Sequence, residues 1–295
     1  MIKAAQSDIR FERPFFSLWV SSILLLTIGC ASAPESKAPR AYTPSEETLN
    51  AIWAATHTDE LFDSLPIKMP IQEMIHDRFH GMGADYQNEI LKLLDRNLEP
   101  QRLQRMLKSH LLKNFNASKA EKVLKFYQTP SGALYGAAGH NFNPEDPAFQ
   151  AFVEGPKPSP ERLEQLALLL TASGSAKFAS ITLITPLETI FFELEHQKRL
   201  AGQKPHHEPA SELRESMQQV VKSMHKAMLL TASFVYRDLT DAQMRELIDF
   251  ESSKSSKWYN VTLLQAYETT LQIAMRRFTR QLLAFIQKGT EPEAD

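Results

Sequence analysis

The chain has 295 residues and a formal net charge of -2, and 43% of its residues are hydrophobic. A chain of this length and composition can bury a full core and is expected to form one or two domains. Charged residues make up 23% without a basic excess, so nucleic acid is not an expected partner. Ten glycines stand against seventeen prolines, and Val-Thr-Ile alternations are few, which predicts an all-α fold punctuated by proline.

The first 29 residues have the pattern of a signal peptide. Lys3, Arg10 and Arg13 precede an apolar stretch over residues 15–28, as in the charged and apolar regions of a secretory signal. About 14 apolar residues are too few to span a bilayer, which takes about 20. We therefore interpret the stretch as an export signal and not as a permanent anchor.

The signal ends in Leu26-Thr27-Ile28-Gly29-Cys30, which resembles the lipobox of bacterial lipoproteins, with Thr27 where that pattern prefers leucine. The resemblance implies that Cys30 is lipidated and holds the protein on a membrane through acyl chains such as palmitate, since each buried methylene adds about 0.8 kcal/mol. The residues directly after Cys30 contain no aspartate, which resembles the sorting of lipoproteins to the outer membrane, facing the periplasm. The alternative is cleavage after Ala33, at the end of an A-x-A site, which would release a soluble protein.

Residues 30–42 are rich in Ala, Pro and Ser and are predicted to form a flexible tether. Folding is expected to start at Thr43-Pro44-Ser45-Glu46, which combines an N-cap, a proline at the first helical position and a capping-box glutamate. A helix is predicted from Pro44 to about Ala55.

Alignment of the chain with itself predicts an internal repeat. The helix start at residues 43–44 recurs at Ser159-Pro160, an offset of 116, and after about eight extra residues within 200–209 the offset becomes 124. The pairs at the first offset are Phe62 with Phe178, Leu65 with Ile181, Pro70 with Pro186, Ile71 with Leu187, Ile75 with Phe191 and His80 with His196; those at the second are Val123–Phe126 with Leu247–Phe250, Asn116 with Thr240 and Thr129 with Ser253. Two helical-bundle repeats are predicted, over 43–140 and 159–288, with a linker over 141–158 and a tail over 289–295.

Local signals predict further helix ends. Thr240 and Gln243 form a capping box, and Asn116, Thr129 and Ser253 are N-cap residues. A last helix is predicted over about 257–287, roughly 45 Å long, with an apolar stripe from Leu264 to Phe285 and an end at Gly289.

The segment Phe126-Tyr127-Gln128-Thr129-Pro130-Ser131-Gly132 resembles the F-Y-x-S/T-P-x-G signature of the domain of unknown function 2059 family. The resemblance covers about half of the mature chain and implies a small helical protein of the bacterial envelope. In the second copy Glu251, Lys254 and Ser256 replace the Tyr, Pro and Gly of the signature. The motif names no catalytic group, so the resemblance leaves the activity open.

The pair His76 and His80 is the candidate for metal chemistry, since histidines at i and i+4 share a helix face. Their segment resembles H-E-x-x-H with the shorter Asp77 in place of Glu. The repeat places Phe192 at the position of His76, which favours a packing site and a partly buried histidine pair over a metal site. No catalytic or cofactor-binding residue is nominated, because the sequence contains no G-x-S-x-G, P-loop or G-x-G-x-x-G motif.

Three functions remain open. The preferred hypothesis is a non-enzymatic interaction module, anchored through Cys30, that docks an envelope protein or a cell-wall component. One alternative is a metal-assisted envelope hydrolase that uses His76 and His80, which requires a pocket where polar groups converge on them. The other is a carrier of hydrophobic ligands, which requires an internal cavity lined by Leu, Phe and Met side chains.

Overall fold

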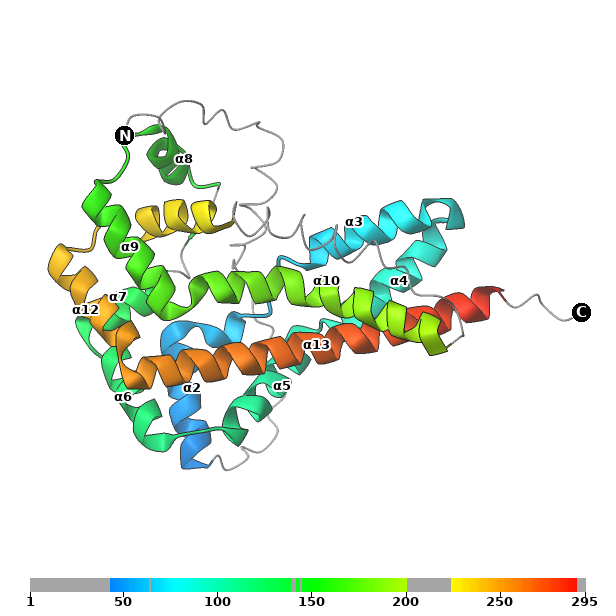
Figure 1. The fold of residues 1–295 in the computed structure, drawn as a ribbon, viewed down its shortest axis with the longest axis horizontal. Coiled ribbons are helices and arrows are strands. Elements are labelled where there is room, and N and C mark those ends of the chain that lie inside the picture. The colour runs from blue at the N-terminus through cyan, green and yellow to red at the C-terminus, as the bar shows by residue number, and fades with distance from the viewer. Residues whose placement is uncertain (1–42, 64, 139–141, 144, 201–223, 291–295) are drawn as a thin grey trace, which may run out of the picture.

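The computed structural model describes residues 43–63, 65–138, 142–143, 145–200 and 224–290 (Figure 1). These residues form helices and no strand, so the predicted all-α fold class is confirmed. The predicted signal peptide, Cys30 and the tether lie outside the described residues.

The range of the first predicted copy contains six α-helices and two short 3-10 helices among its described residues. They are α2 (Pro44–Thr56), η1 (Thr58–Glu60), α3 (Lys68–Phe79), η2 (His80–Met82), α4 (Ala84–Asn97), α5 (Pro100–Lys113), α6 (Ala117–Tyr127) and α7 (Pro130–Ala138). The later range contains α9 (Pro160–Ser173), α10 (Ser175–Leu200), a helical segment over residues 224–235, α12 (Asp241–Ser252) and α13 (Lys254–Thr290).

The helix starts follow the capping signals of the sequence. The Thr43 side chain accepts a hydrogen bond from the Glu46 N–H while the Glu46 carboxylate accepts one from the Thr43 N–H, so the predicted capping box is confirmed. The other predicted N-caps are confirmed in the same way, each worth about 1 kcal/mol; they are Asn116, Thr129, Ser159, Thr240 and Ser253. The predicted end at Gly289 is wrong, because α13 includes Gly289 and a helix passes through a glycine at a cost of only about 1 kcal/mol.

Two long helices, α10 and α13, lie side by side and run in the same direction along the molecule (Figure 1). Thr182 and Tyr267 share a hydrogen bond of 3.1 Å between their hydroxyls, and further along Arg280 Nε donates to Glu193 Oε1 at 2.7 Å. On its other sides α13 contacts α4, α5 and α6. The last helix therefore joins elements from the whole described chain.

One hydrophobic core joins residues from both predicted copies. The predicted stripe of α13 supplies Leu264, Tyr267, Leu271, Met275, Phe278 and Leu282, each with at most 7% of its surface exposed. Burying one such side chain contributes about 1.5–3 kcal/mol, so α13 is a main source of stability.

One pair of residues that the repeat aligns is in direct contact in the structure, and another pair shares a neighbour. Phe126 stacks on Phe250, its predicted counterpart, with ring centroids 3.6 Å apart and planes at 7°. Phe62 and Phe178, another predicted pair, both stack on Tyr267, at 5.5 and 4.7 Å. Contact between equivalent positions is what a two-fold arrangement of two copies produces. The duplication itself stays a prediction.

The predicted linker contains the helix α8 (Pro147–Glu154). Its Phe149 packs edge-to-face against Phe142 and Phe234, with ring centroids 4.9 and 5.2 Å apart. These three side chains form a small core of their own that holds α8 on the helical segment over 224–235.

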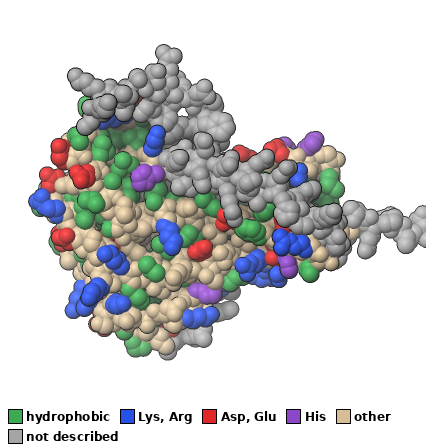
Figure 2. Space-filling view, viewed as in Figure 1, with side chains coloured by type: hydrophobic (Ala, Val, Ile, Leu, Met, Phe, Trp, Pro, Cys, Tyr) green, Lys and Arg blue, Asp and Glu red, His purple; other side chains and the backbone are tan. Residues whose placement is uncertain are grey.

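In the part of the chain that the structure describes, no single helix is long and apolar enough to cross a membrane. The helices α9 and α10, up to Gln197, meet the criterion only as a pair bent by 59°. On the face shown in Figure 2, acidic and basic side chains are interspersed with small apolar patches.

Candidate functional site

A cavity of about 450 Å³ lies where the two predicted copies meet. Its walls come from the ends of α2 and α6, from α7, from the junction of α9 and α10, from residues 224–236 and from α12 and α13. The apolar part of the wall includes Leu61, Phe178, Leu183, Met228 and Leu263, and the polar part includes Tyr127, Tyr135, Tyr236, Tyr259, Tyr267, Glu251 and Asn260. Ligand sites in proteins have volumes of about 300–1,000 Å³ and this mixed character.

Two glycines of α7 allow Tyr127 and Tyr135 to lie next to each other at the cavity. A Cβ at Gly132 would stand 2.0 Å from the Phe126 carbonyl oxygen, and one at Gly136 would stand 2.1 Å from the Ala55 carbonyl oxygen. Only glycine allows this approach of α7 to α6 and α2. As a result Tyr127 and Tyr135 lie with parallel rings whose centroids are 6.2 Å apart.

Glu251, in the last turn of α12, is the buried charged group of the cavity, with 2% of its surface exposed. Ser256 Oγ donates a hydrogen bond of 2.5 Å to Glu251 Oε2, and Asn260 Nδ2 donates one of 2.7 Å to the same oxygen. The Tyr135 phenol lies near this carboxylate. No lysine or arginine is among the described residues that line the cavity.

The tyrosines around Glu251 are held neutral. Burial first, and then the negative charge of Glu251, raises the pKa values of Tyr127 and Tyr236. Burial likewise raises the pKa of Tyr135, with Tyr236 and Glu251 as further causes. Each of these phenols therefore keeps its proton at neutral pH and remains a hydrogen-bond donor.

Tyr259 and Trp53 leave polar atoms unpaired beside the cavity. The Tyr259 hydroxyl oxygen and Trp53 Nε1 are buried, and neither has a partner of hydrogen-bond geometry among the described residues. Burial raises the pKa of Tyr259 to about 12, although the nearby Thr58, Thr56 and Trp53 side chains act to lower it. Buried donors without a protein partner usually meet water or a ligand, and Tyr259 lines the cavity.

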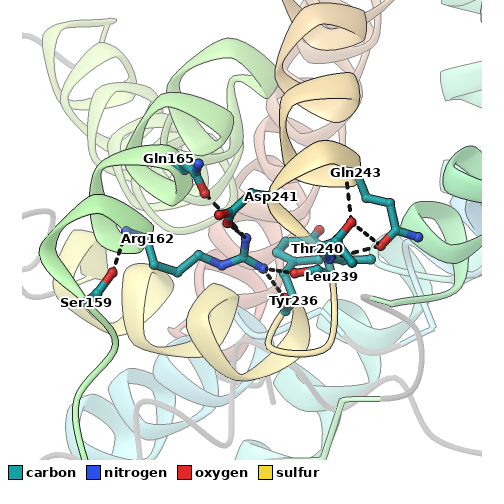
Figure 3. A network of polar contacts seen from close by, with 8 residues as sticks. All are labelled: Ser159, Arg162, Gln165, Tyr236, Leu239, Thr240, Asp241 and Gln243. Atoms are coloured by element: carbon teal, nitrogen blue, oxygen red, sulfur yellow. Dashed lines mark hydrogen bonds and ion pairs between the residues drawn. The ribbon is translucent and has the colours of Figure 1, made fainter.

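Arg162 holds the turn that carries Tyr236 (Figure 3). Its Nη2 donates hydrogen bonds of 2.7 Å to the carbonyl oxygens of Tyr236 and Leu239, and its Nη1 lies 3.5 Å from Asp241 Oδ1. The α9 helix is thereby tied to the turn before α12 by charge-assisted hydrogen bonds, which are stronger than neutral ones. This bridge fixes the backbone from which the Tyr236 ring reaches the cavity.

The two candidate metal ligands do not form a site. Helix α3 ends at Phe79, so His80 belongs to η2 and does not share a helix face with His76. His76 Nδ1 lies 3.3 Å from Gln87 Oε1, while His80 Nδ1 lies 2.9 Å from the Asp77 carbonyl oxygen. Both histidines are exposed, so the predicted half-buried pair is wrong. Among the described residues no group of three or more potential ligands could hold a metal ion.

The predicted packing role of Phe192 is also wrong, because 52% of its surface is exposed. The repeat aligns Phe192 with His76, and both residues are exposed.

Sequence reasoning did not single out the polar cluster of the cavity, although a signal was present. At the offset of 124, Glu251, Ser256 and Asn260 take the places of Tyr127, Gly132 and Gly136. Where the first range has two glycines at helix contacts, the second has polar side chains that bond to one another. Two of the three departures from the signature that the first range resembles, Glu251 and Ser256, therefore belong to this polar cluster.

Comparison of the chain with protein-family models, with curated proteins and with solved structures gives no match. The argument for function consequently depends on the cavity and on the sequence signals.

Proposed function

We propose that this protein is a lipid-anchored, helical protein of the bacterial envelope that binds a small molecule with an apolar body in the cavity between its two predicted copies. The observation that carries the proposal is a 450 Å³ cavity whose mostly apolar wall contains a few converging polar groups. It favours the ligand-carrier hypothesis over docking of a partner protein, which needs a broad apolar groove on the surface.

The size and the wall of the cavity suit a small ligand with an apolar body. Its volume of about 450 Å³ lies in the range of ligand sites in proteins. Water can bond to polar groups such as Glu251 and Tyr259, but the Leu, Met and Phe side chains of the wall offer it no hydrogen bonds.

The chemistry of the cavity supports binding more than catalysis. Its phenols are neutral, and the Ser256 hydroxyl, with 1% of the residue exposed, is already bonded to Glu251. A serine nucleophile needs access to its substrate and a set of donors around the reacting oxygen. The groups of the cavity are instead placed to hold and orient a ligand.

The anchor is supported by the sequence alone. The lipobox-like ending at Cys30 and the thirteen residues over 30–42 would hold Thr43, where the first described helix is capped, within about 45 Å of a membrane surface, at about 3.5 Å per extended residue. A protein so placed can exchange an amphiphilic ligand with the bilayer.

Ligand binding is tested by fluorescence titration with the neutral apolar probe N-phenyl-1-naphthylamine. Ala179→Leu adds three carbons to the cavity wall, and Ala54→Leu adds the same atoms at an exposed position of α2. We expect the probe to bind the unaltered chain and Ala54→Leu alike and to lose at least about tenfold in affinity for Ala179→Leu, because overpacking costs about 1–3 kcal/mol.

If Ala179→Leu does not fold, as judged by circular dichroism, Met228→Trp fills the cavity from a different helical segment of its wall. Equal affinity of the probe for a folded cavity-filling variant and for Ala54→Leu would refute binding in the cavity. No binding of the probe to any of these proteins would refute the proposed function.

The anchor is tested separately by intact mass and membrane fractionation of the expressed protein beside a Cys30→Ser variant. We expect the unaltered protein to carry an acyl mass and to sediment with membranes, and the variant to lose both. A soluble protein that begins after Ala33 would overturn the anchor and leave the cavity proposal standing.

A further inference from the structure

We infer that the ligand carries a positively charged amine or ammonium group, and that this group binds Glu251 among the tyrosines while the apolar body fills the rest of the cavity. The inference rests on the proposed function, because it names the ligand class of the same cavity.

The first argument is the charge of Glu251. A carboxylate offers about four positions to hydrogen-bond donors, and Ser256 and Asn260 account for two. Both donors are uncharged. Buried charges are normally paired with an opposite charge, since desolvation without one is costly. A cationic ligand would supply a further donor and the opposite charge that the described residues of the cavity wall give no lysine or arginine to provide.

The second argument is the aromatic wall. Tyr127, Tyr135, Tyr236, Tyr259 and Tyr267 line the cavity. Aromatic rings attract cations, and such rings are the usual surroundings of bound ammonium groups. The ring of Tyr135 lies 6.2 Å from that of Tyr127 and 5.8 Å from that of Tyr236, so three phenols surround one end of the cavity together with Glu251. An anionic head group would meet the carboxylate at this end and be repelled.

The third argument is the apolar remainder of the wall. Leu61, Phe178, Leu183, Met228 and Leu263 come from four separate parts of the chain, two of them from α10, and supply no charge. A free metal ion or a small inorganic cation would leave this surface without a partner. The ligand therefore combines a cationic head with an apolar body, as an alkylamine does.

The comparison of the two predicted copies implies one site per chain. The first range has Tyr127 at the position of Glu251, and glycines at the positions of Ser256 and Asn260. It has neither the carboxylate nor its two supporting donors. We expect a stoichiometry of one ligand per chain.

The experiment is isothermal titration calorimetry with octylamine, octanol and octanoate, three probes that share one apolar body and differ in the charge of the head. The protein is the full chain with Cys30→Ser, which removes only the predicted acylation site. Because a hydrogen bond to a charged group is stronger than one between neutral groups, we expect octylamine to bind at least about tenfold more tightly than octanol. Octanoate should bind most weakly.

The variant Glu251→Gln removes the charge of the site, and Asp249→Asn removes a charge from an exposed position of the same helix. We expect the preference for octylamine over octanol to disappear in Glu251→Gln and to persist in Asp249→Asn. If Glu251→Gln does not fold, the three probes still test the inference on the unaltered cavity.

Equal binding of octylamine and octanol, or a preference that survives Glu251→Gln, would overturn the cationic head and leave the apolar cavity intact. Failure of all three probes together with N-phenyl-1-naphthylamine would instead overturn the proposed function.

Discussion

Gly132 and Gly136 are expected to be the two most sensitive glycines of the described chain. An added methyl group would stand 2.0 Å from the Phe126 carbonyl oxygen in Gly132→Ala and 2.1 Å from the Ala55 carbonyl oxygen in Gly136→Ala. Contacts of Cβ atoms essentially never fall below 3.0 Å, so α7 would have to move by about 1 Å against backbone atoms that cannot rotate away.

Two opposing effects set the size of the loss. Alanine is better than glycine in a helix by up to about 1 kcal/mol, whereas overpacking costs about 1–3 kcal/mol and more when backbone must shift. We expect each variant to lose about 1–3 kcal/mol in the free energy of unfolding, measured by urea denaturation with circular dichroism. For a chain of this size that corresponds to a fall in Tm of about 2–4 °C per kcal/mol.

Gly81→Ala is the matched control, because nothing lies within 4 Å of a Cβ at Gly81 and its φ angle is not positive. This variant should be as stable as the unaltered protein. If Gly132→Ala and Gly136→Ala were also unchanged, the close packing of α7 on α6 and α2 would be refuted, and with it the reason why Tyr127 and Tyr135 meet at the cavity.

Two further variants test contacts that support the site and the long helices. Arg162→Met removes the donors to two carbonyl oxygens at 2.7 Å while leaving an apolar side chain of similar length (Figure 3). The free energy of unfolding, measured by urea denaturation, should fall by about 2–3 kcal/mol. An unchanged midpoint of urea denaturation would show that these two hydrogen bonds do not contribute to stability. The hydrogen bond from Arg280 lowers the pKa of Glu193 from its ordinary value of 4.5. The ionised carboxylate therefore stabilises the fold fully at pH values above 4.5, and this stabilisation is lost as the pH falls through the lowered pKa. The stability advantage over Glu193→Gln should therefore be largest near pH 7, at about 1 kcal/mol or less because the Arg280 side chain is 62% exposed. It should shrink as the pH is lowered below 4.5, and a difference that stays constant would contradict the ion pair.

Much of the helical architecture was determined by short-range signals in the sequence. The capping box at Thr43 and the N-caps at Asn116 and Thr240 act within three residues, so they can be recognised without knowledge of the fold. The apolar stripe from Leu264 to Leu282 likewise follows from helical periodicity, and all of its predicted members up to Leu282 are buried.

The predictions that failed concern places where tertiary packing overrides a local pattern. His76 and His80 have helical spacing, but the chain leaves α3 after Phe79, so the two side chains find different partners. Gly289 is a common helix terminator, yet α13 continues through it. The residue at which a helix ends depends on what the following residues contact in the folded protein. The sequence pattern of a single helix gives no information about those contacts.

The candidate site was decided by the tertiary structure alone. Glu251 meets Tyr135 only because α7 and α12 pack together, and the cavity exists only because helices from both predicted copies close around it. The sequence contains one signal of the site: at the offset of 124, Glu251, Ser256 and Asn260 replace Tyr127, Gly132 and Gly136. These replacements acquire a chemical meaning only in three dimensions, because burial strengthens the interactions of a carboxylate, and burial is a property of the packed helices and not of any one segment.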